Sequence, residues 1–221
     1  SDLPDLPELP VQYPDYAIWQ REHIAGKYLE DQLAWWKEQL AGLEPLEIPI
    51  DFPRPARQSN RGDTYGFSVE NQLLRELKAL SLQSEATLFM TLLSALKILL
   101  ARYVGKEDIC VGTSLANRNH KSLERLAGFF VNNLVLRTQI EPGSTFRGVL
   151  GQVRSTVLSA FAHQDVPFEK IVDLVETGRN LNRTPVFQVL FTLHNTPEVP
   201  VLEFDNLHLS PVSSGQKRTL Y

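Results

Sequence analysis

Several features that define large classes of proteins are scarce or missing in this chain of 221 residues. Its one cysteine, Cys110, cannot form an internal disulfide, and no set of cysteine and histidine residues has the spacing of a zinc site. The 22 basic residues do not outnumber the 26 acidic ones, which argues against a broad nucleic-acid or anionic-membrane surface. The longest apolar run, Leu88–Tyr103, is interrupted by Lys97 and is too short to cross a bilayer. Residues 1–10 also lack signal-peptide features, so we expect a cytoplasmic protein. The cysteine and histidine spacing leads us to expect no metal site.

Common catalytic motifs are missing as well. The chain has no G-x-S-x-G elbow, no phosphate-binding G-x-x-x-x-G-K-[ST] loop, no G-x-G-x-x-G turn and no H-E-x-x-H helix. Its five histidines are scattered, and none stands at a spacing that suggests a catalytic triad. The residues alone therefore identify no enzyme class.

The hydrophobic patterns predict an α/β layered domain. Residues 1–12 carry proline at every third position up to Pro10, which is typical of a stiff extended connector. A long helix is expected over 13–43, interrupted near Gly26, and further helices over 73–80, 88–100, 146–162 and 168–175, with Thr87 as a cap. Strands are expected over 64–69, 109–115, 129–140, 186–193 and 202–209.

Four segments carry more polar detail than a core requires: Tyr13–Trp19, Gly112–Asn119, Gly128–Arg137 and His163–Glu169. In the first, Asp15 can cap the helix, with aromatic residues packed below it. In the second, Asn117 and Arg118 follow a buried strand, where ligands often lie in α/β sheets, although paired asparagines are also common in plain turns. Asparagines in an apolar strand, as in the third, either bridge strands or line a ligand. The fourth has the features of a helix start.

These segments also carry a family resemblance. Tyr13–Trp19 resembles the motif Y-x-D-[FY]-A-x-W, Gly128–Arg137 resembles G-x-F-V-N-T-x-x-x-R, and His163–Glu169 resembles [HN]-Q-D-x-P-F-E. Arg179–Val186 resembles R-D-x-S-R-x-P-L more loosely, and Gly105–Gly112 and Ala116–Arg118 also fit. Together and in this order, the motifs resemble those of the condensation domain of nonribosomal peptide synthetases, from Leu9 to Leu209.

Three departures accompany the resemblance. Asn133 stands where the family usually has threonine, and Asn180 and Asn182 replace the aspartate and serine of the last motif. The family's H-H-x-x-x-D-G motif, which lies upstream of the Tyr13 motif in relatives, does not occur in this chain. We therefore expect residues 13–221 to be the C-terminal lobe of a condensation domain, truncated at both ends, with residues 1–12 as its connector.

The resemblance implies a fold similar to chloramphenicol acetyltransferase, with two lobes in a V and the active site in a tunnel between them. It implies amide bond formation between a donor aminoacyl or peptidyl thioester and an acceptor amine, both held on phosphopantetheine by carrier domains. No cofactor would bind this chain directly. The implied partners are upstream and downstream peptidyl carrier domains, the N-terminal lobe and an adenylation domain in cis, with no nucleic acid and no membrane.

The resemblance also assigns roles to individual residues. No catalytic residue is expected in this chain, since the histidine motif is missing, so the chain alone is predicted to be inactive. Residues expected near the tunnel or substrate are Asn117, Arg118, Asn132 and Asn133. Those expected to be architectural are Asp15, Trp19, Gly128, Arg137, His163, Gln164, Asp165 and Arg183, together with Asn132 as a candidate for both roles. Arg118 and Arg183 are the candidates to pair with the aspartate of the missing motif.

Two alternatives remain open at this point. The same fold serves epimerisation domains and standalone acyltransferases, although the His163 and Tyr13 motifs favour condensation. A non-catalytic carrier-docking module, whose tunnel has lost its histidine, is the alternative from another functional class. The upstream sequence would distinguish it, because only an enzyme needs the H-H-x-x-x-D-G motif.

Overall fold

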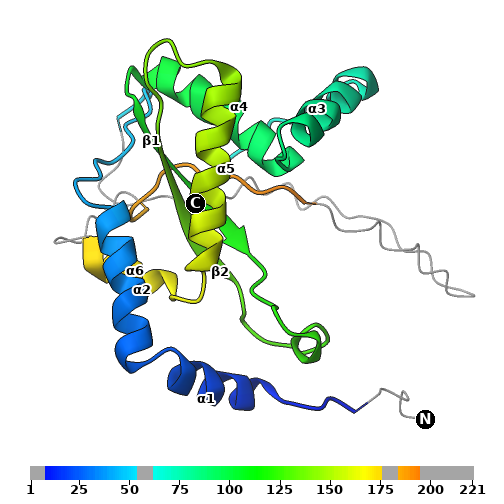
Figure 1. The fold of residues 1–221 in the computed structure, drawn as a ribbon, viewed down its shortest axis with the longest axis vertical. Helices are drawn as coiled ribbons and strands as arrows, with labels where there is room; N and C mark the ends of the chain where they lie inside the picture. Colours follow the sequence, from blue (N-terminus) through cyan, green and yellow to red (C-terminus); the bar gives the residue numbers. More distant parts are fainter. Residues whose placement is uncertain (1–7, 54–61, 176–183, 195–221) are drawn as a thin grey trace, which may run out of the picture.

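Helices surround a pair of strands in the computed structural model, which describes residues 8–53, 62–175 and 184–194 (Figure 1). The helices are α1 (Tyr13–His23), α2 (Gly26–Gln39), α3 (Asn71–Gln83), α4 (Leu88–Val104), α5 (Phe146–Ala162), α6 (Phe168–Val175) and a short 3-10 helix, η1 (Lys121–Leu123). The strands are β1 (Asp108–Leu115) and β2 (Asn132–Gln139). This mixture of helix and sheet confirms the predicted α/β class.

The two strands pair antiparallel, from Asp108 opposite Gln139 to Leu115 opposite Asn132. Buried residues follow one another without alternation in the middle of β1, which indicates that both faces of the sheet are covered. Residues 187–191 run beside β1 for a short distance, because the Gly112 amide donates to Val189 O at 2.8 Å and the Phe191 amide donates to Gly112 O at 2.9 Å. A side chain at Gly112 would overlap the ring of Phe187, so this close approach requires glycine.

Helix α4 is the central helix of the core. Thr87 Oγ1 accepts from the Met90 amide at 3.2 Å, as predicted, and Gly105 ends the helix in a left-handed conformation with φ 69°. Its buried residues pack against α5 and β1. Within the described residues no single helix is long and apolar enough to cross a membrane, and α3 with α4 passes that test only as a pair bent by 103°.

Four expectations require correction or qualification. The long helix predicted over 13–43 is two helices, α1 and α2, separated near Gly26 as anticipated. Residues 64–69 form no strand, and Tyr65 and Phe67 are 89% and 79% exposed; the alternating pattern is present, but no partner strand pairs with it in the part of the chain that the structure describes. Residues 186–193 contribute one bridge, Gly112 with Leu190, rather than a full strand. The strand predicted over 202–209 lies outside the described residues.

Candidate functional site

Parts of the four polar segments lie around α1 and the long loop between β1 and β2. At the start of α1 the N-cap residue is Gln12 rather than Asp15. Asp15 is the third residue of the helix, and its Oδ2 accepts from the Gln12 amide at 2.8 Å, which closes the first turn. Tyr13 Oη donates to Phe129 O at 2.9 Å, and the Tyr13 ring covers Gly128 so closely that any Cβ there would overlap it. The Tyr13 motif and the Gly128 motif are therefore parts of one contact.

Arg118 organises the loop itself. The preceding residue, Asn117, adopts a left-handed conformation with φ 51°, which asparagine tolerates better than most residues. Arg118 Nη1 donates to Leu123 O and, at 2.7 Å, to Leu126 O, while the guanidinium lies 4.2 Å from the centre of the Phe130 ring. The side chain thus holds the loop against the residues that lead into β2.

Asn132 connects β2 to the His163 motif. Its Nδ2 donates to Gln164 O at 2.9 Å and to Val166 O at 2.8 Å, and its Oδ1 accepts from the amides of Asn133 and Phe168, both at 3.0 Å. The side chain is 8% exposed. The Asn132 side chain therefore supplies hydrogen-bond partners to backbone groups of the turn before α6.

Asn133 points to the opposite side of the strand and makes a different contact there. Ser114 Oγ donates to Asn133 Oδ1 at 2.7 Å, which is a side-chain bridge between β1 and β2. The two asparagines of the motif thus act in different places, as the alternation of a strand requires.

His163 is held by aromatic side chains of α2. Its ring stacks on Trp35 with 3.9 Å between the ring centres and 4° between the planes, and its Nδ1 lies 2.9 Å from Ser159 O. Trp36 Nε1 donates to His163 O at 3.0 Å. His163 therefore links α2 to the end of α5.

Asp165 forms the next contact of the same turn. Tyr28 Oη, from α2, donates to Asp165 Oδ2 at 2.7 Å. This hydrogen bond to the carboxylate, together with burial, raises the pKa of Tyr28 to about 12, so the phenol stays protonated at neutral pH. The hydrogen bond thereby ties Asp165 to α2.

Arg137, at the far end of β2, ties the sheet to the end of α2. Its Nε and Nη2 contact the carboxylate of Asp108 on β1, with Nη2 to Oδ2 at 2.8 Å, and its Nη1 donates to Gln39 O and Ala41 O at 3.1 and 2.8 Å. The ion pair is largely shielded from water, with 19% and 25% of the two side chains exposed. Arg137 therefore holds the sheet against the end of α2 and makes none of the contacts beside α1 described above.

We expect Arg137→Lys to lower the free energy of unfolding by about 1–3 kcal/mol, because lysine cannot reproduce the forked contact with Asp108 and the two carbonyl contacts together. Urea denaturation followed by circular dichroism measures the change. The control is Lys27→Met, which removes an exposed ion pair with Asp31 and should cost less than about 1 kcal/mol. Equal losses in both variants would contradict a special role for Arg137.

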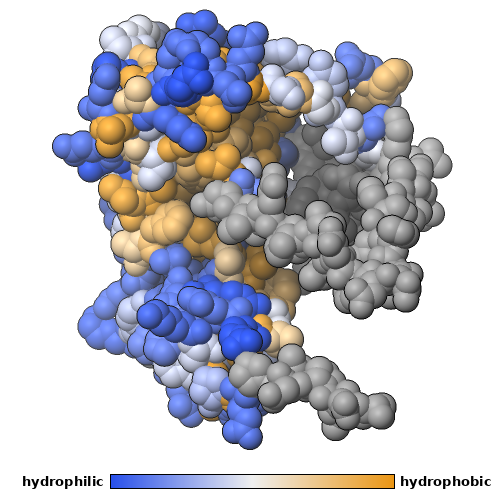
Figure 2. Space-filling model, turned by 90° about the vertical axis from the view of Figure 1, so that its right-hand side faces the viewer, coloured by the Kyte–Doolittle hydropathy of each residue, from blue (hydrophilic) through white to orange (hydrophobic). Residues whose placement is uncertain are grey.

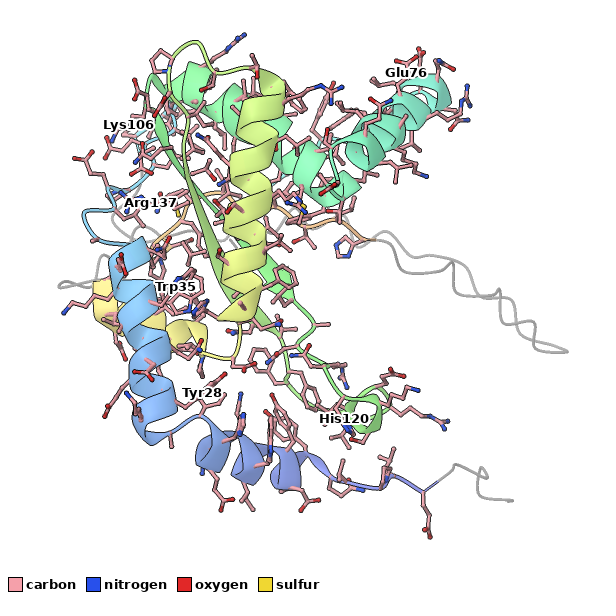
Figure 3. The ribbon with its side chains drawn as sticks, in the orientation of Figure 1. Tyr28, Trp35, Glu76, Lys106, His120 and Arg137 are labelled. Carbon is pink, nitrogen blue, oxygen red and sulfur yellow. The ribbon has the colours of Figure 1, made fainter. Side chains whose placement is uncertain are left out.

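A cavity of about 550 Å³ opens beside α1. Figure 3 shows Tyr28 on α2 and His120 on the loop after β1, both above α1, and His120 lines the cavity. Trp19, which we expected to pack beneath α1, is instead 53% exposed; its ring stacks on His23. The residues that line the cavity are Val11, Asp15, Tyr16, Trp19, Gln20, Ile24, Asn117, Asn119, His120, Ser122, Leu123 and Asp165.

Of the residues predicted to lie near the tunnel or substrate, only Asn117 lines this cavity. Arg118, Asn132 and Asn133 lie nearby in the chain, but their side chains bond to other groups of the fold. Arg183 lies outside the described residues. Within those residues, no three side chains of the metal-binding types gather closely enough to hold an ion.

Sequence reasoning missed two residues that the structure makes prominent. Tyr28 gave no signal, because a tyrosine on a helix carries no indication of its distant partner Asp165. Lys97 enters the sequence pattern only as an interruption of an apolar run, yet it is fully buried. A lysine within such a run is the signal that could have identified it.

Comparison with known proteins shows the family to which the chain belongs. The family model of the condensation domain matches residues 3–217. The chain is 48% identical over 218 residues to one subunit of the linear gramicidin synthase of Brevibacillus parabrevis, covering 98% of the chain and 3% of that subunit. It is 42% identical over 215 residues to one subunit of the plipastatin synthase of Bacillus subtilis, covering 97% of the chain and 8% of that subunit. The chain thus spans a small part of these relatives.

Solved structures show the same fold. The X-domain from teicoplanin biosynthesis superposes with a TM-score of 0.78 at 32% identity, covering 85% of this chain and 43% of that one. A four-domain nonribosomal peptide synthetase bound to AMP and glycine gives a TM-score of 0.72 at 28% identity, covering 77% of this chain and 13% of that one. The predicted chloramphenicol-acetyltransferase-like fold class is confirmed by these neighbours. The chain belongs to the condensation-domain family.

Proposed function

We propose that residues 13–221 form the C-terminal lobe of a condensation domain, with residues 1–12 as its connector, and that the complete domain joins two amino acids by an amide bond. The donor is an aminoacyl or peptidyl thioester and the acceptor is an amine, both carried on phosphopantetheine by upstream and downstream carrier domains. The observation that carries this proposal is the family match over 3–217, together with 42–48% identity to subunits of peptide synthases.

The reaction requires an oriented, desolvated amine and polar groups that support the tetrahedral oxyanion. The amine attacks the thioester carbonyl, its proton leaves, and the donor carrier departs as a thiol. In this chain, Asn117 is the tunnel candidate that lines a cavity. Arg118, Asn132 and Asn133 use their side chains in internal contacts, so we propose that they position the walls of the tunnel rather than contact the reacting atoms.

An exposed apolar surface on the described part of the chain supports the proposal of a second lobe. Figure 2 shows an apolar band across the middle of one face, between polar regions above and below it. Around the entry to β2 and on α5, large apolar side chains are exposed: Phe129 by 74%, Val131 by 50% and Leu158 by 51%. Exposed apolar area of this kind is typical of a surface that another part of a protein covers. An N-terminal lobe is the proposed cover, and an adenylation domain in cis would supply the loaded carriers.

The proposal is tested by reconstitution. The complete condensation domain, with loaded donor and acceptor carriers, should produce an amide on the acceptor carrier, detected by mass spectrometry of the intact carrier protein. We expect no product from the 221-residue chain alone, because the H-H-x-x-x-D-G motif does not occur in it. Product from the chain alone would contradict the division of roles between the lobes.

A carrier-docking or scaffold module is the second candidate, favoured by one observation. The X-domain neighbour, with a TM-score of 0.79 and 32% identity, is solved as a complex with OxyB. If the complete domain binds loaded carriers but yields no amide, the docking function replaces condensation. If it yields amide, docking alone is excluded.

A further inference from the structure

Residues 65–69 form a strand-like segment whose backbone has no partner among the described residues. Tyr65, Phe67 and Val69 stand at every second position, and all three side chains are exposed. No backbone hydrogen bond joins residues 65–69 to another described residue. Backbone groups and large apolar side chains are normally paired or covered in a folded protein. This segment therefore has the features of a strand whose neighbour lies outside the described residues.

Helix α3, which follows this segment, is also incompletely covered. It packs against α4 and projects from the rest of the described molecule (Figure 1). Leu73, Leu77 and Leu80 line one side of α3, yet only Ser81 of its 13 residues is buried. The apolar side of a helix normally lies against another layer of the protein. The region from residue 65 to residue 80 therefore lacks such a layer in the part of the chain that the structure describes.

The described chain ends beside this region. Phe191 contacts Phe89 with 5.3 Å between the ring centres, and Phe89 lies in the first turn of α4, directly after the turn from α3. His194, three residues beyond Phe191, is the last residue described. Seven further residues reach up to about 25 Å when extended, and α3 is about 20 Å long. The chain after residue 201 can therefore reach the start of α3, where residues 65–69 lead into it.

We propose that residues 202–209 of this chain pair with residues 65–69 as the neighbouring strand, and that the two together cover the start of α3. The sequence predicts a strand over 202–209, and this segment stands between two prolines, Pro200 and Pro211, which cannot donate to a ladder of hydrogen bonds. A second strand supplies the backbone donors and acceptors that residues 65–69 lack among the described residues.

The side chains of the proposed strand fit such a position. Leu202 and Phe204 stand on one side of an extended backbone, and Glu203 and Asp205 stand on the other. The first pair can pack against apolar side chains of the α3 region, while the carboxylates face water. Phe204 and Glu203 are therefore neighbours for which the proposal predicts opposite effects of substitution.

This inference goes beyond amide formation and does not depend on it, since it is tested on the folded domain without substrate. Hydrogen exchange of the complete condensation domain is followed by mass spectrometry. We expect the amides of residues 65–69 to exchange at least about 100-fold more slowly than in an unstructured peptide of the same sequence. Phe204→Asp should accelerate this exchange at least about tenfold without changing that of β1 and β2. Glu203→Gln is the matched control and should leave it unchanged.

Cross-linking identifies the neighbouring strand. Phe67→Cys is combined in turn with a cysteine at each position of 202–209, and the buried Cys110 does not compete. Mild oxidation should join Phe67→Cys only to positions directly opposite it, because paired strands bring Cα atoms within about 5.5 Å there. If Phe204→Asp unfolds the whole domain, the disulfide result decides.

Three results would overturn the proposal. The first is rapid exchange at residues 65–69 in the complete domain. The second is protection that Phe204→Asp leaves intact. The third is protection without any disulfide to 202–209, since a segment from elsewhere, such as the N-terminal lobe, would then be the neighbouring strand.

Discussion

Lys97→Ala is expected to lower the free energy of unfolding by about 3–5 kcal/mol. The Lys97 amine is fully buried between α4 and the sheet, and it donates to Leu136 O at 2.6 Å, to Thr138 Oγ1 at 2.7 Å and to Ile109 O at 3.4 Å. Alanine would remove the amine from these acceptors and leave a cavity where the aliphatic stem lies. Urea denaturation followed by circular dichroism measures the loss.

Lys97→Met separates the two parts of that loss. Methionine keeps most of the stem volume but donates no hydrogen bond, so we expect a smaller loss of about 1–3 kcal/mol. Lys78→Ala, on the exposed side of α3, is the control for removing a lysine from a helix and should change stability by less than about 0.5 kcal/mol. A loss at Lys97 no larger than at Lys78 would contradict a structural role for the buried amine.

The buried amine should also make stability depend on pH. Burial lowers the pKa of Lys97 to about 7. The Cys110 thiol is also buried, which raises its pKa to about 12, so this thiol stays neutral. Between about pH 7 and 10 the unfolded chain therefore binds a proton that the folded chain does not, and stability rises with pH by at most about 1.4 kcal/mol per unit. The stability difference between the wild type and Lys97→Met should grow by about 2 kcal/mol from about pH 7 to 9. A constant difference would mean that the amine stays charged in the fold.

Asn132→Ala is the second large effect, with an expected loss of about 2–4 kcal/mol in the free energy of unfolding. The side chain bonds to four backbone groups, and alanine would leave them without these partners in a buried place. We expect the stability of α6 and the turn before it to fall more than that of the sheet. Hydrogen exchange should show faster exchange at Phe168 and in α6 than in the sheet.

Asn133→Ala is the matched control, because it changes the same residue type one position along the strand. It removes one contact, that with Ser114, and should cost about 1 kcal/mol without accelerating exchange in α6. If both variants lose the same stability, the link from β2 to the His163 motif is not what holds α6. Asn132→Asp should also be strongly destabilising, because a carboxylate would face the carbonyls of Gln164 and Val166.

The helices could be predicted because their information is local. Thr87 and Thr145 cap α4 and α5 through amides three residues ahead, and the apolar spacing of α5 matches its observed bounds, Phe146–Ala162. The strands β1 and β2 could also be anticipated, since each is apolar enough to be buried. The strand predicted over 64–69 does not form, and the one predicted over 186–193 forms only a single bridge, for the same reason. A strand exists only when a partner supplies hydrogen bonds, and alternation at Tyr65 and Phe67 does not encode that partner.

The sequence by itself determined the helices, the central strands and, through its motifs, the family and the segments that carry the site. Only the tertiary structure decided what those motif residues do. It showed that Asn132 bonds the turn before α6, that Arg118 closes its own loop, and that Asp165 meets Tyr28 across 137 positions of the chain. It also revealed the buried amine of Lys97. These contacts join side chains far apart in sequence, so they depend on how the elements pack, which no local pattern records.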